Sequence, residues 1–358
     1  MSSTTKKYTP PGLSSLTFEF VQPAQLQAKD IQEIVDFLDG QDTSHPFQFP
    51  QWAQITDAKY LPTCRFLIGK RDSRIVWFAS AGTLYPLGRI VRQFRGLVIT
   101  RGPVCDDVAI YREILPLLEK EVSALGYLFI EANPDVITGL TPGIFESFQE
   151  AKWVTRGRAA TSLRLNLDAP EKQLLAQFRK STRYEIKRAQ DHGICIVKSS
   201  YDRKEIKKFL QIYNSMSKRK GFQADSDDDL KRAIGWLSRE SNRGALLLAM
   251  ENSAIRGGVI IVRAAKRCWY VWGATESNFK VNVGHILQWY ALLWAKAQGC
   301  SEYDFGGYTE KATSGPAFFK KGFGGSLVKF MPSQRKIVKP KSYNSFRLLR
   351  QFRGISDE

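Results

Sequence analysis

Aromatic, lysine and glycine residues crowd together between Gly315 and Gly325, where the sequence is Gly-Pro-Ala-Phe-Phe-Lys-Lys-Gly-Phe-Gly-Gly. A glycine allows the backbone to approach a ligand closely, because it carries no side chain. A lysine ammonium group attracts phosphates and developing oxyanions. This mixture of residue types predicts a segment that contacts a ligand.

The residues before this segment predict the elements that hold it. A strand over 268–272 is followed by a helix over 284–297, which Gly299 ends. Residues 302–307 then predict a short strand that closes in a Gly-Gly turn. The apolar positions of the helix lie at helical spacing and predict that it is buried: Ile286, Tyr290, Leu293 and Ala297.

The order strand, helix, glycine, strand, Asp-Phe-Gly-Gly, linker and Phe-Lys-x-Gly-Phe-Gly-Gly resembles the C-terminal signature of the FemABX family. The resemblance is densest over 269–330, and weaker matches extend it over most of the chain. It implies an α+β fold of two tandem GNAT-like domains, each a mixed sheet flanked by helices. It also implies the family's activity, which is transfer of an amino acid from aminoacyl-tRNA to the stem-peptide amine of a peptidoglycan precursor during cross-bridge formation.

Some members of that family insert a long helical arm in the second domain. Here residues 200–242 predict only two helices, over 204–218 and 227–239, which are too short for such an arm. The chain therefore resembles the compact, armless members.

The resemblance also implies catalytic residues. Phe319 and Lys320 occupy the position of the family's paired Phe-Lys, beside the peptide or acyl-acceptor end. Lys320 would there stabilise the developing oxyanion or bind the tRNA terminus. Arg101 opens an Arg-Gly-Pro segment like that of the family, and Asp106 follows it near the acceptor amine. Asp106 and Asp304 are the candidate bases for the amine proton, and a substrate phosphate is the alternative.

A basic stretch between the two halves predicts a contact with phosphates. Over 178–189 four cations fall on one helical face: Lys180, Arg183, Lys187 and Arg188. A solvated helix surface explains the same charges. A similar basic helix of the family carries an arginine on the precursor's phosphates, which implies that role for Arg183, with Lys187 beside it.

A second phosphate contact is implied by an aromatic segment near the N-terminus. The family has a lysine shortly after a Phe-x-x-x-x-Trp segment, which Phe47 to Trp52 resembles. The position aligned to that lysine is Thr56, and Lys59 is the nearest base. The sequence departs from the family here, and Lys59 is the substitute that we expect.

Composition and charge bound the remaining possibilities. The 358 residues suggest two domains, and 53 Lys and Arg against 35 Asp and Glu give a net charge of +18, which attracts polyanions. Five scattered cysteines form no Cys-x-x-Cys pair, so we expect neither a disulfide framework nor a metal site. No signal peptide or apolar run of about 18 residues is present, so we expect a cytoplasmic protein. We also expect it to be a monomer.

The order hairpin, strand, helix, strand occurs twice, which predicts two copies of one unit. We place the domains at 1–155 and 156–331, with a basic tail at 332–358. In the tail, Phe346, Leu349 and Phe352 form one stripe with arginines beside it. The stripe either packs on the first domain or contacts the inner membrane surface.

The loop over 279–285 indicates which acyl donor the protein uses. Acyl-CoA enzymes of the GNAT fold hold the diphosphate with an Arg/Gln-x-x-Gly-x-Gly/Ala loop, and this loop lacks the pattern. We therefore expect no cofactor, aminoacyl-tRNA as co-substrate, and a UDP-linked or lipid-linked precursor as acceptor. Two alternatives stay open: a GNAT-like N-acyltransferase that uses acyl-CoA on another amine, and a non-catalytic RNA-binding protein.

Overall fold

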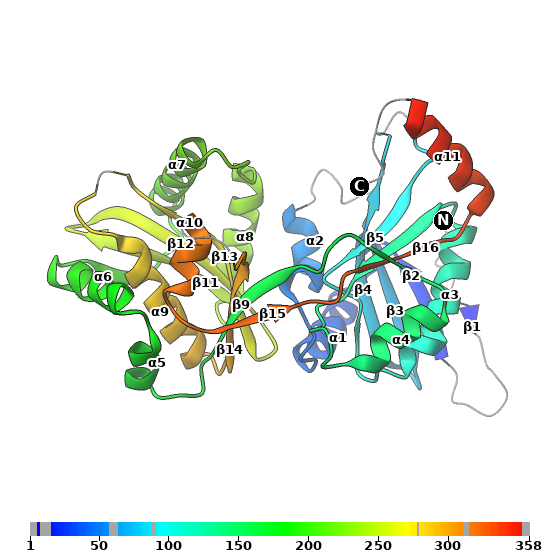
Figure 1. Ribbon diagram of the computed structural model, residues 1–358, viewed down its shortest axis with the longest axis horizontal. Helices are drawn as coiled ribbons and strands as arrows, with labels where there is room; N and C mark the ends of the chain where they lie inside the picture. The colour runs from blue at the N-terminus through cyan, green and yellow to red at the C-terminus, as the bar shows by residue number, and fades with distance from the viewer. Residues whose placement is uncertain are drawn as a thin grey trace. The chain divides into compact units, whose positions relative to one another are not determined.

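The computed structural model describes residues 6–7, 16–56, 64–87, 91–277, 279–310 and 315–352, and the chain divides into two compact units. The first unit combines Met1–Ala160 with Lys329–Glu358, and the second is Thr161–Val328 (Figure 1). The chain therefore leaves the first unit, builds the second, and returns.

The first unit is a mixed sheet with the strand order β1-β2-β3-β4-β5-β7-β16-β8, and β6 pairs with β4. Its strands are β1 (Lys6–Lys7), β2 (Leu16–Val21), β3 (Arg65–Arg71), β4 (Arg74–Leu84), β5 (Gly96–Thr100), β6 (Val104–Cys105), β7 (Phe129–Asn133), β8 (Val154–Arg156) and β16 (Ser333–Ile337). Its helices are α1 (Ala28–Asp39), α2 (Pro50–Thr56), α3 (Ile110–Ala124), α4 (Pro142–Glu150) and α11 (Pro340–Phe352), with short 3₁₀ helices at Pro23–Gln25 and Pro46–Gln48.

The helix α3 shows why this unit folds as it does. Ile110, Ile114, Leu118 and Val122 recur every four residues, so they share one face of the helix, and all four are buried. They join a core cluster with Trp77 of β4. The helical spacing of these apolar residues therefore accounts for the burial of α3 against the sheet.

The second unit is a mixed sheet with the order β10-β11-β12-β13-β14-β9-β15. Its strands are β9 (Thr161–Asn166), β10 (Cys195–Lys198), β11 (Gly244–Glu251), β12 (Ala254–Ala264), β13 (Arg267–Thr275), β14 (Glu302–Gly307) and β15 (Ser326–Lys329). Its helices are α5 (Glu171–Gln177), α6 (Lys180–Asp191), α7 (Arg203–Lys220), α8 (Asp227–Arg239), α9 (Val283–Ala297) and α10 (Gly315–Lys321).

Helices cover both faces of this second sheet (Figure 1). Side chains alternate along a strand, and Val259 and Ile261 of β12 join the same core cluster as residues of α9. Gly258, the position before Val259, faces the other way, because a Cβ placed on it would lie 2.8 Å from a ring carbon of Phe209 in α7. The helix α9 is thus on one face, and α7 is on the other.

The predicted repeat is present in the topology. The hairpin β3–β4, strand β5, helix α3 and strand β7 correspond to β11–β12, β13, α9 and β14. In each unit the strand before the helix runs parallel to the strand after it. The α+β fold of two repeated units, predicted from the sequence, is confirmed.

The helix α9 is buried over a wider face than its sequence predicted. The helix itself is confirmed, and Ile286 is buried as expected, whereas Tyr290 and Leu293 are only half-buried and Ala297 is exposed. Its buried positions are Val283, Ile286, Leu287, Gln288, Trp289, Ala291, Leu292 and Ala295. The reason is that α9 packs against the sheet and also against α6, so two of its faces are covered.

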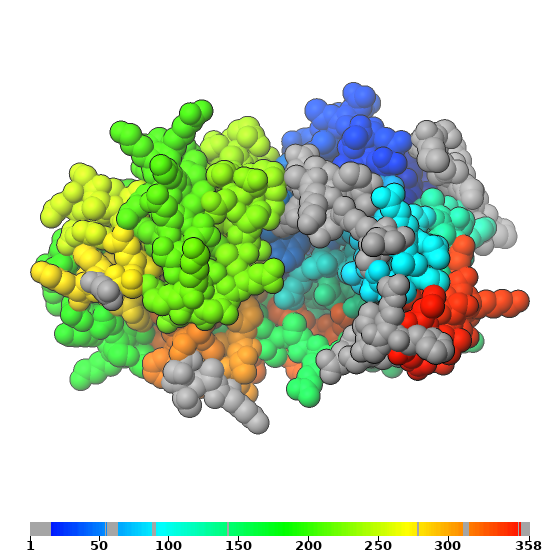
Figure 2. Space-filling view, turned by 90° about the horizontal axis from the view of Figure 1, so that it is seen from above, coloured from blue at the N-terminus to red at the C-terminus, as the bar shows by residue number. Residues whose placement is uncertain are grey.

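The tail forms α11 on the surface of the first unit, drawn in red in Figure 2. Phe346 is 2% exposed, and its ring centroid lies 5.7 Å from that of Phe94. Tyr343 contacts the ring of Phe129 with a centroid distance of 6.1 Å. No helix in the described ranges is both long and apolar enough to cross a lipid bilayer.

We predict that Phe346 anchors α11. Phe346→Ala removes a buried ring, which costs about 3–5 kcal/mol where the site cannot collapse. Because α11 rests on a small satellite cluster, we expect local release of the helix rather than global unfolding. Hydrogen exchange of the amides over 340–352 should accelerate strongly in this variant. Leu348→Ala is the matched control, because Leu348 is 55% exposed; equal exchange in both variants would contradict the prediction.

Candidate active site

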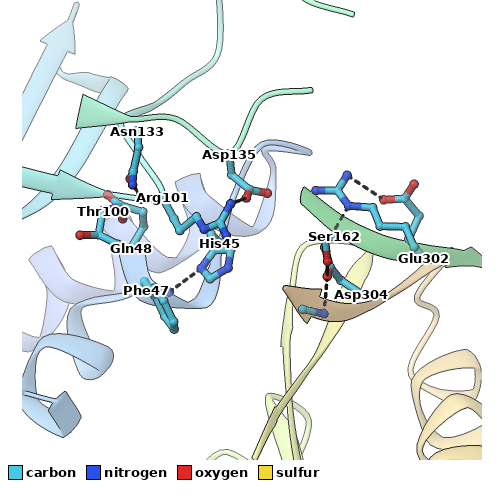
Figure 3. A network of polar contacts seen from close by, with 12 residues as sticks. His45, Phe47, Gln48, Thr100, Arg101, Asn133, Asp135, Ser162, Glu302 and Asp304 are labelled. Carbon is cyan, nitrogen blue, oxygen red and sulfur yellow. Dashed lines mark hydrogen bonds and ion pairs between the residues drawn. The ribbon is translucent and has the colours of Figure 1, made fainter. Parts of the chain in front are cut away.

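The site is built around a buried carboxylate on β14. Asp304 is 1% exposed, and its Oδ2 accepts a hydrogen bond from Nε of Arg164 at 3.0 Å. Its Oδ1 accepts from the hydroxyl of Ser162 and from the backbone N–H of Gly306 at 2.8 Å. Figure 3 shows Ser162 beside this carboxylate, and Glu302 pairs with the same Arg164 at 3.6 Å. Both strands that carry the network are neighbours in the sheet, with Asp304 opposite Arg164.

Lys320 lies against the turn that this carboxylate fixes. Its Nζ donates a hydrogen bond to the carbonyl oxygen of Gly307 at 2.8 Å. Burial of the half-buried ammonium group lowers the pKa of Lys320 to about 8, and the nearby charge of Asp304 opposes that shift. The ammonium form therefore still dominates at neutral pH, where it can donate hydrogen bonds to a developing oxyanion.

Phe319, the residue before Lys320, belongs to a cluster of aromatic rings. The Phe319 ring lies 4.9 Å from the ring of His285 and 5.3 Å from that of Phe323, centroid to centroid. Phe323 is fully buried. Burial lowers the pKa of His285 to about 4, so its imidazole is neutral at physiological pH. The cluster holds α10 against the start of α9.

A cavity of about 640 Å³ opens beside this cluster. Its walls come from α6, from the segment that joins β13 to α9, from the start of α9 and from α10. Phenylalanine rings share the lining with groups of both charges: Glu185, Arg188, Glu276, Phe279, Lys280, His285, Phe318 and Phe319.

The helix α6 does not direct all of its cations outward. Nη1 of Arg183 donates to the carbonyl oxygens of Ala176 and Phe178, at 2.9 and 2.7 Å, so this guanidinium caps the end of α5. Lys187 is exposed and pairs with Asp191 at 3.6 Å. Although α6 and α10 both line the cavity, neither Arg183 nor Lys320 is among its lining residues.

Asp106 lies in the first unit, in a second cavity of about 360 Å³. The cavity is lined in part by Glu33, Asp36 and Arg74. Burial raises the pKa of Asp106 above its usual value. A carboxyl group with a raised pKa is a better proton acceptor than an ordinary one, because its conjugate acid is weaker.

Arg101 belongs to a separate polar network of the first unit (Figure 3). Its Nη1 pairs with Asp135 Oδ1 at 3.2 Å, and its backbone N–H donates to Asn133 Oδ1 at 2.6 Å. The guanidinium also lies 4.5 Å from the ring centroid of Phe330. Lys59, the other predicted phosphate contact of this half, lies outside the described residues.

Several of these groups were not singled out from the sequence. Glu185 and Glu276 are acidic residues that line the cavity, and Phe318 completes its aromatic wall. The sequence shows Glu185 only as an acid in the middle of the basic helix α6, which is ordinarily a surface feature. Within the described ranges, no three His, Cys, Asp or Glu side chains gather where they could hold a metal ion.

Comparison with known proteins gives a family match for the second unit. Residues 176–321 match the family described as the acetyltransferase (GNAT) domain. The second unit is therefore an acyltransferase domain, as predicted. A search of curated protein sequences found no match.

Solved structures extend the comparison to both units. The chain is similar to FemX, with 16% identity and a TM-score of 0.76 over 88% of this chain and 97% of that one. It is also similar to L-PGS from Bacillus licheniformis, with 11% identity, a TM-score of 0.56, and coverage of 94% and 98%. A tandem GNAT protein from the clavulanic acid biosynthesis pathway has 8% identity, a TM-score of 0.52, and coverage of 90% and 98%. The resemblance to FemABX proteins is confirmed in the fold.

We predict that the Asp304 network stabilises the second unit strongly. In Asp304→Asn the guanidinium of Arg164 remains buried without its closest carboxylate, which costs about 3–5 kcal/mol. Urea unfolding followed by circular dichroism measures this loss. The control is Asp191→Asn, which removes an exposed pair with Lys187 and should cost about 1 kcal/mol or less. Equal stability of the two variants would show that the network contributes little.

Proposed function

We propose that this protein transfers an aminoacyl group from aminoacyl-tRNA to the amine of a peptidoglycan stem peptide. The observation that carries the proposal is Lys320, a half-buried lysine of α10 whose pKa is lowered to about 8 and whose Nζ donates to the glycine turn of β14. The acyltransferase match and the fold shared with FemX support the same reaction class. The net charge of +18 favours a polyanionic donor.

In the proposed reaction the acceptor nitrogen attacks the ester carbonyl, so a C–N bond forms while the bond to the ribose oxygen breaks. The carbonyl oxygen carries the negative charge of the tetrahedral intermediate, and the ammonium group of Lys320 neutralises it. The proton of the attacking amine leaves to a base and ends on the ribose oxygen. Positioning of the two reactants supplies most of the remaining acceleration, about 7–11 kcal/mol at best.

The proposed base is Asp106, whose raised pKa suits a proton acceptor. Asp304 accepts three hydrogen bonds within the second unit, which favours a positioning role for it. The precursor's phosphates remain assigned to Arg101, Arg183, Lys187 and Lys59. Of these, Arg183 would have to release its carbonyl partners before it binds a phosphate.

The alternative acyl donor is acyl-CoA, and the similarity to a tandem GNAT protein favours it. The cavity beside α9 can be compared with what the diphosphate of this donor requires. A diphosphate at this helix start would need free backbone N–H groups and positive charge. The N–H of Gly284 is already taken by the Asn282 side chain at 3.1 Å. Glu185 and Glu276 of the cavity lining repel a diphosphate, whereas Arg188 and Lys280 of the same lining attract one. We propose aminoacyl-tRNA as the donor because the loop over 279–285 lacks the glycine pattern that holds the diphosphate of CoA.

The proposal is tested by incubating the purified protein with radiolabelled aminoacyl-tRNAs and with UDP-linked and lipid-linked precursors. Label in the precursor supports aminoacyl transfer and identifies the donated amino acid. Label transfer only from acyl-CoA would assign the rival reaction. Binding of tRNA with no transfer to any amine would leave a non-catalytic RNA-binding protein. Sedimentation with anionic liposomes, with and without residues 341–358, tests the proposed contact with the membrane surface.

We predict that Lys320 is needed for transfer and not for binding. Lys320→Ala removes the charge that stabilises the oxyanion, so kcat should fall about 10²–10³-fold. Binding of tRNA, measured by filter retention, should stay within a factor of about two, because one charge among many is lost. Lys321→Ala is the matched control, since Lys321 is exposed and adjacent in the sequence. A normal rate in Lys320→Ala contradicts the role.

The lowered pKa of Lys320 predicts a particular pH profile. The free acceptor amine becomes about tenfold more abundant per pH unit up to its pKa of about 10.4, which raises kcat/KM. Above a pH of about 8 the loss of the Lys320 proton cancels that gain, so the profile should flatten. Lys320→Arg stays charged, so its lower rate should keep rising to pH 9.5. A wild-type rate that rises without a break through pH 8 would exclude a protonated Lys320.

A further inference from the structure

The outer face of α11 takes no part in the proposed reaction. The inner face of this helix holds it on the first unit, where Phe346 and Tyr343 pack with Leu87, Phe94 and Phe129 (Figure 1). An apolar group left on the outer face of such a helix favours a further contact, because covering it would remove apolar surface from water.

Two large apolar side chains of α11 lie on that outer face. Leu348 is 55% exposed, and Leu349 is 43% exposed. The sequence predicted that Leu349 shares a stripe with Phe346, but of these two only Phe346 is buried. The two predicted roles of the tail, packing on the first domain and contact with a membrane, are therefore compatible, because different side chains are available for each.

A third exposed leucine lies on the same side of the sheet as α11. Leu84 ends β4 and is 45% exposed. It pairs with Gly96 of β5, and directly opposed residues point to the same face of a sheet. A Cβ on Gly96 would lie 2.1 Å from the ring of Phe129, and that ring contacts Tyr343 of α11. The exposed apolar surface thus includes the outer face of α11 and the end of β4.

The charges of α11 are all of one sign. Residues 340–352 include Lys341, Arg347 and Arg350 and no acidic residue. Lys341 and Arg347 are exposed, and neither forms an ion pair within the part of the chain that the structure describes. Exposed leucines and cations together are typical of a helix that lies in the interface of an anionic bilayer. The leucines enter the acyl region, and the long basic side chains reach the lipid phosphates.

A second kind of polyanion matches only half of this surface. The phosphates of an RNA strand attract the cations but offer the leucines no apolar partner. A bilayer that contains anionic lipids supplies both, because each Lys or Arg near its surface is attracted and apolar side chains can insert. We propose that the outer face of α11, together with Leu84, docks the first unit on an anionic lipid surface. The inference rests on the proposed function in one respect: it places the enzyme where a lipid-linked acceptor is found.

The test measures cosedimentation of the full-length protein with vesicles of phosphatidylcholine, either pure or mixed with phosphatidylglycerol. We expect binding to the mixed vesicles only. Leu348→Gln combined with Leu349→Gln removes apolar groups without changing the charge, and should lower partitioning about tenfold or more. Arg347→Gln should lower it about fivefold, as expected for one cation near an anionic surface. Leu140→Gln is the matched control and should bind like the wild type, because Leu140 is 73% exposed and lies between β7 and α4.

Three outcomes overturn the inference: no binding of the wild type to mixed vesicles, equal binding to both kinds of vesicle, or an unchanged partition coefficient in the double variant. A wild type that ignores vesicles, with tRNA binding that falls in Arg347→Gln, would assign the surface to RNA instead. Hydrogen exchange over 340–352 shows whether α11 stays folded in each variant. If the double variant releases the helix, Arg347→Gln decides the inference in its place.

Transfer assays separate this outcome from failure of the proposed function. With a lipid-linked precursor in mixed vesicles, the double variant should transfer more slowly than the wild type. With a UDP-linked precursor in solution, the two should be equal, because no surface is involved. Vesicle binding without transfer to either precursor keeps the docking surface and removes the proposed reaction. Transfer without vesicle binding removes only the docking surface.

Discussion

The candidate active site depends on one buried charge, the carboxylate of Asp304. Taking a carboxylate out of water costs several kcal/mol unless hydrogen bonds replace its hydration. Two of the replacements come from β9, through Ser162 and Arg164, and the third from Gly306 of the same turn. The carboxylate therefore ties the first strand of the second unit to the turn that presents Gly307 to Lys320. Removing this carboxylate would weaken both the pairing of β9 with β14 and the contact of Lys320 with the turn at Gly307.

The same charge sets the electrostatic balance at Lys320. Burial alone favours the neutral amine, because an ammonium group loses hydration when it is covered. The negative charge of Asp304 acts in the opposite direction, and the result is a pKa of about 8. A lysine in this range is charged at neutral pH and yet is less strongly solvated than a surface lysine. Both properties strengthen its interaction with an oxyanion, because a poorly solvated charge is screened less by water.

Local sequence patterns predicted much of the fold, because helix faces and helix ends depend on neighbouring residues. The helix over 284–297 that Gly299 follows, the helix over 227–239 and the repeat of hairpin, strand, helix and strand all follow from spacing and from glycine positions. What could not be predicted is the pairing of distant segments. Strand β16 lies beside β7, and its Arg335 faces Glu131 across 204 residues of chain. No short pattern records such a contact.

The candidate site shows the same limit at the level of side chains. The sequence shows that Arg183 is on a basic helix, but not that its guanidinium turns back to the carbonyls of Ala176 and Phe178. A long side chain selects among many rotamers, and the choice depends on the nearest unsatisfied acceptors. Glu185 was missed for a related reason: an acid on a helix surface becomes a candidate ligand contact only once α10 and the β13–α9 segment enclose it.

The glycines around α10 explain how one short helix serves two purposes. Consecutive residues of a helix point about 100° apart, so Phe319 faces the cavity while Lys320 faces β14. This arrangement requires α10 to lie close to its neighbours. A Cβ on Gly322 would come within 2.4 Å of the Thr182 hydroxyl in α6, and one on Gly325 within 2.5 Å of the Arg164 carbonyl in β9. Side chains at these two positions would push α10 away from α6 and from the strand that anchors Asp304. The glycines of the Phe-Lys-x-Gly-Phe-Gly-Gly segment are thus needed less for contact with a ligand than for bringing the helix near both walls at once.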